Sequence, residues 1–568
     1  MKKNYTIIFL LTTLIAFTQE TESEKKDYGK VFGGFESNSA WYLNDPKFGE
    51  FGISQPNNPI RSNNYLFVNY NYKNFTAGIQ AEGYEKEALL NFNPKFNQSN
   101  IATYFLNFKN KTFDITVGYF YEQFGSGLIL RTWEDRALGI NNALRGIRVI
   151  AKPTEYLTLT GLYGQQRTGF ELSEGKITGF NTDINLSDLF KFESFDWSLG
   201  ASFVGRHEQT TIENPNFQPL TMATSHRMSF SYNSFYANYE FVSKSKDAFV
   251  TTDPFIDNYF VKVGNALLVN MGYSKNSLGI DLTLRRIQNM GFYSERLPDT
   301  YSEFQTTSIN YNDKILNFVP GLTKQHHYNL ANIYVYQAQN RIEFKSTEIM
   351  KAGEIGGQID LFYNFKKGTK IGGKYGTKIA VNLSNWNNLS GNYNFSPKDY
   401  KTDVVGFGQK YFSDYNIEIT KKVSQKLHLG FTYINQYYNR QYIEDKPDQI
   451  KANILGAEGT YTFGKNKSIR LVAEHLWTQE DRKNWAGATV EFNFANKYSL
   501  YVWDIYNYGN KVAGNRTNYY NIGGSYRIKS TRIAMNYGRQ RGGLVCVGGV
   551  CRFVPESTGL SLSLNTSF

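Results

Sequence analysis

Apolar and polar residues alternate along most of this 568-residue chain. Between positions 113 and 121, for example, Phe113, Ile115, Val117, Tyr119 and Tyr121 share one face. A period of two is typical of a β-strand whose two faces meet different surroundings. The same pattern recurs at residues 66–72, 280–284, 359–365, 427–433 and 533–537. The alternation therefore predicts an all-β protein with many amphipathic strands.

The connections between the predicted strands are of two kinds. Short turns rich in Lys, Asn, Ser and Gly occur at several positions, such as Lys73-Asn74 and Lys529-Ser530, and much longer loops lie between them. Outer-membrane barrels have tight periplasmic turns and long external loops, and their strands of about 10 residues would number about 20–24 here. We expect a large antiparallel transmembrane β-barrel with long external or lumenal loops. Its lumen must be water-filled or plugged by other segments of the chain.

Composition supports a barrel and argues against other classes. Aromatic residues make up 16% of the chain although its mean hydropathy is −0.47, which suits a barrel with aromatic girdles. Beyond the N-terminus there is no apolar run of about 18 residues, which excludes a helical membrane protein. The net charge of +12 comes from lysines spread singly over turns. We therefore expect lipopolysaccharide and membrane lipid as partners, and no nucleic acid.

The N-terminus has the layout of a secretory signal peptide. Two lysines precede an apolar run from Ile7 to Phe17, and small or polar residues follow. We predict that residues 1–18 are the signal peptide and that residues 19–568 form a barrel in the outer membrane of a Gram-negative bacterium. Strand patterning begins near Lys30, which leaves no room for a folded plug domain ahead of the barrel.

Residues 121–149 interrupt the strand rhythm and are the densest charged segment. Gly125 and Gly127 allow sharp turns, and the apolar residues between positions 128 and 140 would be costly to leave in water. We predict that this segment folds into the lumen and constricts it; an external loop with ordinary surface ion pairs is the alternative. Catalysis is not expected, because adjacent carboxylates would point to opposite faces of a strand. The charged residues of the predicted constriction are Glu122, Arg131, Glu134, Asp135, Arg136, Arg145 and Arg148.

A second excursion covers residues 290–336, which are too many for a turn and predict a large external or lumenal loop. It contains His326 and His327, which raise the hypothesis of a metal site. The chain has only 6 histidines, and sequence neighbours on an extended backbone rarely bind one ion together. We therefore favour a hydrogen-bonded or solvated pair, and predict no metal, cofactor or catalytic residue.

Both cysteines, Cys546 and Cys551, lie near the C-terminus. Their spacing is not that of a thioredoxin-like motif, and a zinc site would need two further ligands. In an oxidising envelope they can close a small ring, which gains about 2 kcal/mol in the chain-entropy model. We predict a disulfide that stiffens the last external loop.

Residues 121–139, 319–336 and 541–555 together resemble an uncharacterised outer-membrane barrel family typical of the Bacteroidetes, over nearly the whole mature chain. The terminal Phe568 resembles the C-terminal signal that the barrel assembly machinery reads. The chain is also similar to the plug subunit of the type IX secretion translocon. This similarity implies a non-enzymatic accessory barrel that seals a large secretion barrel. A porin-like channel for small solutes is the alternative. A hydrolase would need a serine beside His428 or His475, and we can place none there.

Overall fold

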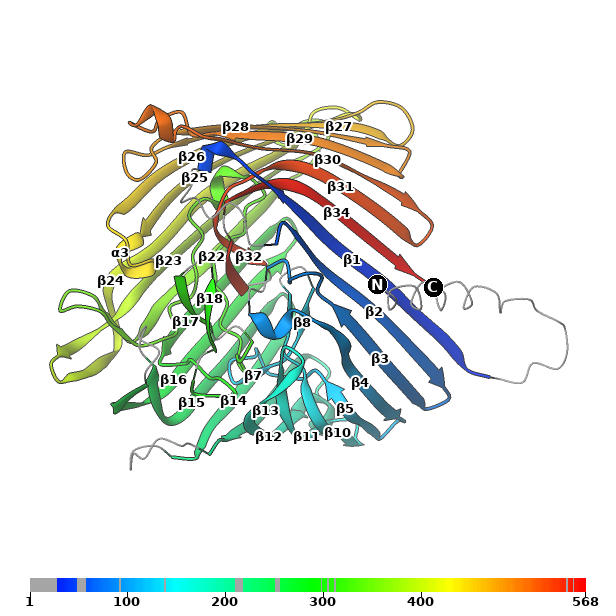
Figure 1. Ribbon diagram of the computed structural model, residues 1–568, viewed down its shortest axis with the longest axis vertical. Coiled ribbons are helices and arrows are strands. Elements are labelled where there is room, and N and C mark those ends of the chain that lie inside the picture. The colour runs from blue at the N-terminus through cyan, green and yellow to red at the C-terminus, as the bar shows by residue number, and fades with distance from the viewer. Residues whose placement is uncertain are drawn as a thin grey trace, which may run out of the picture.

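The computed structural model contains one closed antiparallel sheet of 24 strands (Figure 1). Each wall strand pairs with the next one along the chain, and the first strand, β1, also pairs with the last, β34. An even number of antiparallel strands in sequence order is the architecture of bacterial outer-membrane barrels. The predicted fold class is confirmed. The structure describes residues 28–48, 58–90, 93–136, 139–209, 218–250, 256–297, 299–303, 306–310, 313–547, 550–554 and 556–568.

The wall strands are β1 (Lys30–Leu43), β2 (Ile60–Tyr72), β3 (Phe75–Gly83), β4 (Ser99–Lys109), β5 (Phe113–Phe120), β10 (Leu144–Thr154), β11 (Leu157–Thr168), β12 (Glu171–Asn185), β13 (Phe195–His207), β14 (Leu220–Tyr232), β15 (Phe235–Val250), β16 (Ile256–Lys275), β17 (Leu278–Gln288), β22 (Gly353–Phe365), β23 (Thr377–Phe395), β24 (Lys398–Lys422), β25 (Leu427–Asn439), β26 (Gln449–Thr462), β27 (Lys467–Trp477), β28 (Trp485–Phe494), β29 (Tyr498–Tyr506), β30 (Asn518–Ile528), β31 (Thr531–Gln540) and β34 (Ser557–Ser567).

The remaining elements are short and lie in the connections. They are β6 (Gln123–Phe124), β7 (Leu130–Arg131), β8 (Glu134–Asp135), β9 (Ile140–Asn141), β18 (Asp299–Glu303), β19 (Thr306–Asn310), β20 (Glu343–Phe344), β21 (Met350–Lys351), β32 (Gly543–Val547), β33 (Val550–Val554), the helices α2 (Leu186–Phe190) and α3 (Arg440–Ile443), and the 3₁₀ turns η2 (Pro46–Phe48), η3 (Pro94–Phe96), η4 (Leu330–Asn332) and η5 (Ala513–Asn515). None of the helices in these described ranges is long and apolar enough to cross a membrane.

The two ends of the barrel differ in the length of their connections. At one end most turns are short, and residues such as Lys73, Asn233, Asn276, Asn466 and Lys529 have φ between 51° and 59°. This left-handed conformation is the one that tight hairpins need, and Asn tolerates it better than most residues. The opposite end carries long loops. By the rule for outer-membrane barrels, the short turns face the periplasm.

The alternation seen in the sequence separates two faces of the wall. On β25, Phe431 and Tyr433 are 51% and 43% exposed on the outside of the barrel, whereas Thr432 and Ile434 are buried. Large exposed apolar side chains recur on strands all around the wall. So much contiguous apolar surface is unfavourable in water, so it is the face that contacts lipid. The protein is an outer-membrane barrel of the Gram-negative type.

The two terminal strands form the seam of the barrel. The backbone N–H and carbonyl of Phe568 bond to those of Gly33 at 3.0 Å each. The Phe568 ring lies so close to Gly33 that a Cβ there would be 2.7 Å from its Cζ. This position suits a residue that guides closure, and the role of Phe568 as an assembly signal stays a prediction. The predicted signal peptide lies outside the described residues, while β1 begins at Lys30, where strand patterning was expected to begin.

Candidate functional site: two loops inside the barrel

Two long loops leave the wall and fold back inside it. The first inner loop is residues 121–143, between β5 and β10, and the second inner loop is residues 289–352, between β17 and β22. In Figure 1 the short strands β7, β8 and β18 of these loops lie within the ring of wall strands. Each loop bonds to wall strands that are far apart around the sheet, and a path through the lumen accounts for those contacts.

One end of the first inner loop is fixed to β1 and β3. The guanidinium of Arg136 donates to Glu36 Oε2 at 3.4 Å and to Gln80 Oε1 at 3.1 Å, and lies 3.3 Å from Glu134 Oε2. Its Cζ is 5.2 Å from the ring centroid of Tyr65. Burial lowers the pKa of Arg136, but the Glu134 and Glu36 carboxylates outweigh that effect and raise it above its ordinary value. Arg136 therefore stays charged and holds the loop to the wall.

The tip of the same loop reaches β15, on nearly the opposite side of the barrel from β1. The backbone N–H of Ser126 donates to Glu240 Oε2 at 3.0 Å, and Glu240 Oε1 accepts from the hydroxyl of Ser225 at 2.7 Å. Gly125 has φ of +55°, and a Cβ on it would lie 2.5 Å from Cδ of Arg227. Glycine suits both the positive φ and this close approach, and a larger residue would have to displace the side chain of Arg227. The first inner loop therefore spans the lumen.

The remaining predicted constriction residues divide between the loop and the wall. β10 begins at Leu144, so Arg145 and Arg148 are wall residues, three positions apart and on opposite faces. Arg148 points inward, 3.6 Å from Glu122 and 3.1 Å from Asp114. Burial raises the pKa of Glu122, against the opposing effects of a backbone N–H and Arg148. Arg145 is exposed on the same face as Ile147, so the expectation that it constricts the lumen is wrong.

The two inner loops are bonded to each other. The backbone N–H of Arg131 donates to the carbonyl of Leu316 at 2.7 Å, and Phe318 N–H donates to the carbonyl of Gly127 at 2.8 Å. The Arg131 guanidinium lies between two rings, with Cζ 3.8 Å from the centroid of Phe318 and 4.9 Å from that of Trp133. Burial lowers the pKa of Arg131, although guanidinium remains charged at neutral pH. The loops therefore form a single body.

Asp135, the last of the predicted constriction residues, lies in β8 of this body.

Apolar burial holds the first inner loop as firmly as its charges do. Leu128, Ile129 and Leu130 are at most 2% exposed and belong to a cluster with Phe292 and Leu316 of the second inner loop. Burying one such side chain contributes about 1.5–3 kcal/mol. The apolar residues that made an external loop unfavourable in the sequence are the ones that join the two loops.

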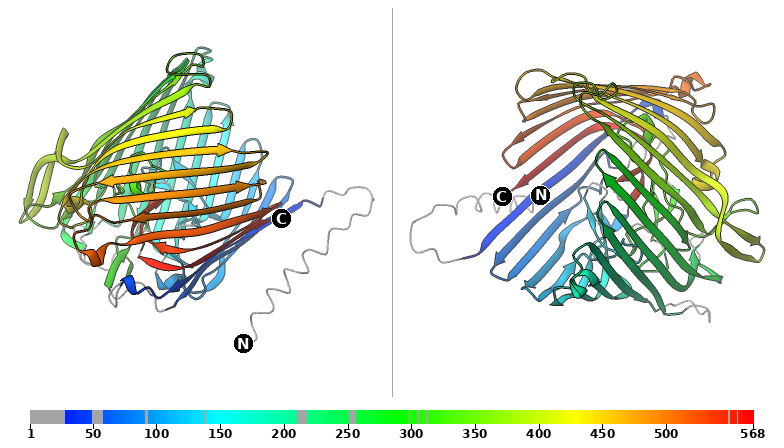
Figure 2. Two further views of the ribbon diagram at one scale, coloured as in Figure 1. Left: turned by 90° about the horizontal axis from the view of Figure 1, so that it is seen from above. Right: turned by 180° about the vertical axis from the view of Figure 1, so that it is seen from behind.

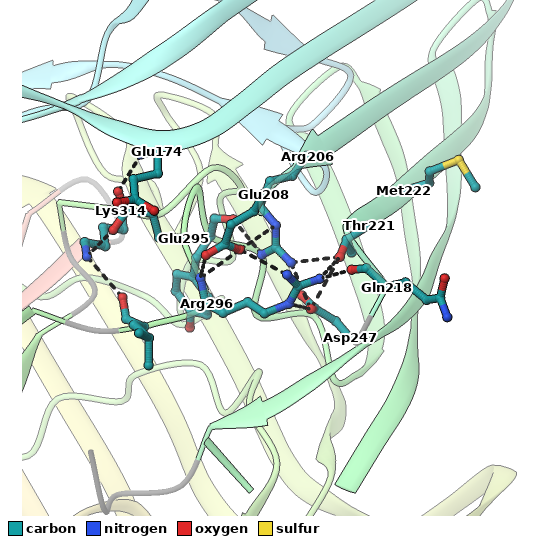
Figure 3. Close-up of polar contacts among 12 residues, drawn as sticks. Glu174, Arg206, Glu208, Gln218, Thr221, Met222, Asp247, Glu295, Arg296 and Lys314 are labelled. Carbon is teal, nitrogen blue, oxygen red and sulfur yellow. Dashed lines mark hydrogen bonds and ion pairs between the residues drawn. The ribbon is translucent and has the colours of Figure 1, made fainter. Parts of the chain in front are cut away.

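A buried ion cluster fixes the second inner loop to β13, β14 and β15 (Figure 3). Arg296 Nε lies 3.1 Å from Asp247 Oδ1, and its Nη1 lies 3.3 Å from Glu208 Oε2. Arg206 Nη2 lies 2.9 Å from the same Asp247 oxygen and 2.8 Å from the hydroxyl of Thr221. Two positive and two negative groups thus meet in one buried place. Breaking such a set by removing one member is strongly destabilising, because a buried charge is left without compensation.

The same loop is also fixed by carboxylates to two further wall strands, β22 and β27. Glu474 on β27 accepts the backbone N–H of Leu330 at 2.7 Å and that of Asn329 at 3.2 Å. Glu354 at the start of β22 accepts the hydroxyl of Tyr336 at 2.5 Å and the backbone N–H of Gln339 at 2.7 Å. These carboxylates satisfy donors of a loop that has little secondary structure of its own.

The histidine pair also serves as an anchor. His326 Nε2 lies 3.0 Å from Asp414 Oδ2, with both side chains buried, and His327 Nε2 lies 3.3 Å from Glu458 Oε2. The two imidazoles therefore bind different carboxylates, on β24 and β26. Within the described ranges, no group of three or more His, Cys, Asp and Glu residues could hold a metal ion. A hydrogen-bonded pair is the arrangement that the structure contains.

A separate ion pair joins two wall strands across the inside of the barrel. Arg167 on β11 donates to Glu82 on β3 at 3.0 and 2.5 Å, and neither side chain has any exposed surface. Strands β4, β5 and β10 lie between these two. Tyr84 and Gln80 also donate to Glu82, at 2.7 and 3.0 Å. The pair therefore links β3 and β11 across the inside of the barrel, beside the first inner loop.

The loop that carries the cysteines leans on the second inner loop. Arg541 donates to the carbonyls of Asn332 and Ile333 at 3.1 and 3.4 Å. In the β32–β33 hairpin, Cys546 and Cys551 are direct register partners. Their side chains lie outside the part that the structure describes, so the disulfide stays a prediction. Direct partners on an antiparallel hairpin have Cα atoms about 4.5–5.5 Å apart, which is within the range of disulfides.

Sequence reasoning did not identify the wall carboxylates that anchor the loops, which include Glu240, Glu354 and Glu474. Each occupies an inward position of its strand. The alternation of inward and outward residues along each strand was the available signal, but every strand of a barrel carries several polar inward residues. The alternation therefore shows which face of the wall a residue occupies, but not which loop group it bonds to.

Some solved structures are similar to this chain at low identity. The siderophore receptor PirA from Pseudomonas aeruginosa has 6% identity and a TM-score of 0.42, over 96% of this chain and 81% of that one. OccAB3 from Acinetobacter baumannii has 10% identity and a TM-score of 0.32, over 96% and 100%. The outer membrane transporter YddB from Escherichia coli has 8% identity and a TM-score of 0.39, over 96% and 81%. Likeness at this level bears on neither substrate nor mechanism.

At the level of sequence, no curated protein matches the chain. One family does: the match to the family of unknown function DUF6029 runs over residues 1–568. Since that match covers the whole length, the chain belongs to the DUF6029 family.

Proposed function

We propose that this protein is a gated, non-enzymatic conduit of the outer membrane, whose lumen is closed at rest by its own two inner loops. The observation that carries the proposal is the way these loops are held. They are bonded to each other, and wall carboxylates on well-separated strands, Glu240 on β15 and Glu474 on β27, accept their backbone N–H groups.

The physical case rests on what a barrel of this size requires. A wall of 24 strands encloses more space than its own side chains can fill, so other groups must occupy the lumen. Here the occupying body is attached through hydrogen bonds and ion pairs, which water can replace, and through apolar clusters that join loop residues such as Leu330 to wall residues such as Ile434. Hydrogen bonds to charged groups contribute about 1.5–3 kcal/mol each. Loss of polar anchors therefore shifts the balance towards an open lumen, whereas the apolar clusters oppose it.

The test is to measure, in planar bilayers, the conductance of protein variants whose loop anchors are weakened. In a Glu240→Gln, Glu474→Gln variant, we expect each neutral amide to weaken its anchor by about 1–2 kcal/mol, which raises the ratio of open to closed states by about 5–30-fold per site. Brief openings should become more frequent than in the wild-type protein. The matched control is Asp360→Asn, since Asp360 bonds only to the wall residues Gln358 and Asn382.

Two outcomes would contradict the conduit. One is a correctly folded double variant that is as silent as the wild-type protein. The other is an equal rise in openings for Asp360→Asn, which would mean that general loosening of the wall, and not release of the loops, opens the lumen.

A second candidate function is the accessory subunit of a type IX secretion translocon, with the similarity noted in the sequence as its basis. The supporting observation is the β23–β24 hairpin, which projects from the wall (Figures 1 and 2). Its register shifts between Leu389 and Gly391, and the bulged residues include Val404 and Val405, 82% and 79% exposed. Exposed apolar residues on a projecting hairpin suit contact with another protein.

Co-purification separates the two candidates. For an accessory subunit, a tagged protein recovered from gently solubilised native membranes should bring down a very large secretion barrel, and Val404→Ser, Val405→Ser should lower that recovery several-fold. Leu220→Ser, an exposed apolar change elsewhere on the wall, is the control. Recovery of the tagged protein alone would exclude the accessory role.

A further inference from the structure

A cavity of about 190 Å³ lies where the two inner loops meet. Its walls combine aromatic rings and side-chain amides with two charged side chains, Glu343 and Arg341, and Cζ of Arg341 lies 5.4 Å from the ring centroid of Tyr293. The rings belong to Trp133, Tyr293 and Phe318, and the amides include those of Gln337, Gln339 and Asn340. Neither the closure of the lumen nor the anchors on the wall need this cavity.

The cavity lies towards the long-loop end of the barrel. Ile443, in the connection between β25 and β26, forms part of its lining. Close by, Lys351 donates to the carbonyl of Tyr442 in the same connection at 2.6 Å. Gln337, on the lining, is exposed to solvent. The cavity is therefore on the side of the joined loops that a solute arriving from outside the cell meets first.

The amides of the cavity are poised for a ligand. Gln339 is held in place, because its Oε1 accepts from Lys351 Nζ at 2.7 Å and its Nε2 donates to the carbonyl of Gln337 at 2.8 Å. Within the described part of the chain, the side-chain amides of Gln337 and Asn340 make no hydrogen bond. A side-chain amide both donates and accepts, and so can bond to a hydroxyl group in either direction.

The one carboxylate of the lining is already neutralised. Glu343 Oε2 lies 2.8 Å from Lys351 Nζ and 3.7 Å from Lys345 Nζ. Burial raises the pKa of Glu343, but the two ammonium groups outweigh burial and leave that pKa below its ordinary value. The carboxylate therefore remains charged and engaged with lysines, and it is not available to bind a cation.

We propose that this cavity binds one ring of a neutral saccharide at the external mouth of the barrel. Vicinal hydroxyls donate and accept, as the free amides do, and the C–H face of a sugar ring packs against aromatic surface. The cavity has the size of a single sugar ring and not of a chain. The role of the sugar as a solute of the conduit rests on the proposed function, whereas binding itself does not.

Binding can be measured without any conductance. The full-length protein is purified in a polyoxyethylene detergent, because detergents with sugar headgroups would compete for the site. Saturation-transfer NMR then reports contact with methyl glucoside, methyl galactoside, N-acetylglucosamine and glucuronate. We expect transfer to at least one of the three neutral sugars, and glucuronate tests whether Arg341 of the lining instead selects an anionic sugar.

Substitutions in the lining test the location. A Gln337→Leu, Asn340→Leu variant loses two hydrogen-bonding groups of about 1 kcal/mol each, so affinity should fall by at least about tenfold. Gln325→Leu, an exposed amide of the same loop outside the cavity, should bind as the wild-type protein does. Folding of each variant is checked by the heat-dependent mobility of the barrel on SDS gels.

Three results would overturn the site: no transfer to any neutral sugar, a preference for glucuronate, or equal affinity in the folded lining variant. These results differ from failure of the conduit. A protein that binds sugar but never conducts contradicts the conduit alone, and one that conducts without binding any sugar contradicts the site alone.

Discussion

A variant without both inner loops should form a permanently open pore in a planar bilayer. The wall permits this change, since Phe120 pairs with Leu144 and Gln288 pairs with Gly353 at the two places where the loops begin and end. A two-residue Asn-Gly turn can therefore replace residues 121–143 and another can replace residues 289–352. We expect steady conductance at least as large as that of porins with about 16–18 strands, which leave an aqueous channel.

Single-loop deletions are the matched comparison. Each removes half of the joined body, so each should conduct less than the double deletion and less steadily. The heat-dependent mobility of the barrel on SDS gels must show that all three variants are folded. A folded double deletion that stays silent would mean that the inner loops do not close the lumen, and a wild-type protein that conducts equally well would lead to the same conclusion.

Replacing Arg167 with methionine should lower the free energy of unfolding by about 3–5 kcal/mol. Methionine keeps much of the length of arginine but leaves the fully buried carboxylate of Glu82 without a counter-charge. The effect is large because the charge cannot reach water and the wall strands around it are fixed by their own hydrogen bonds. The measurement is the midpoint of guanidinium unfolding in detergent, followed by tryptophan fluorescence.

A double variant separates loss of charge balance from loss of packing. Glu82→Gln, Arg167→Met removes both charges, and the amide introduced by the first change can still accept the hydroxyl of Tyr84. Most of the lost stability should return. Arg527→Met, at an exposed position on β30, should change stability by no more than about 0.5 kcal/mol. Equal destabilisation by the single and double variants would show that packing, and not charge, sets the effect.

The barrel wall could be predicted from the sequence because the pattern that specifies it is local. Lipid contacts one face of every strand, so the alternation at positions such as Phe431 and Tyr433 is imposed by neighbours two residues away. The turn residues are equally local, as the left-handed Lys73 and Lys529 illustrate. The strand count fell within the expected range for the same reason.

The path of the inner loops depends on contacts that no local pattern records. Arg136 and Glu36 are 100 residues apart in the chain, and Ser126 and Glu240 are 114 apart. The sequence indicated that residues 121–149 carry too much apolar surface for water, which favours burial. The sequence did not show which wall residues would contact this segment.

The position of Arg145 could have been predicted better from the local sequence pattern. Leu144, Gly146 and Arg148 alternate with Arg145 and Ile147, so the strand pattern extends back through the charged segment. Charge density set the predicted boundary at Val149, whereas the start of β10 is set by pairing with β5. Charged residues that are close in sequence therefore lie on opposite faces of the wall where they belong to a strand.

The even number of wall strands has a practical consequence for labelling the protein on cells. Because β1 begins and β34 ends at the short-turn end, a tag attached at Phe568 faces the periplasm and is hidden from antibodies on intact cells. The connection after β29 lies at the opposite end, where an added Cβ on Gly514 would have no atom within 4 Å. An epitope inserted at Gly514 should be displayed at the cell surface, at the cost of one hydrogen bond from Lys47 in the connection after β1.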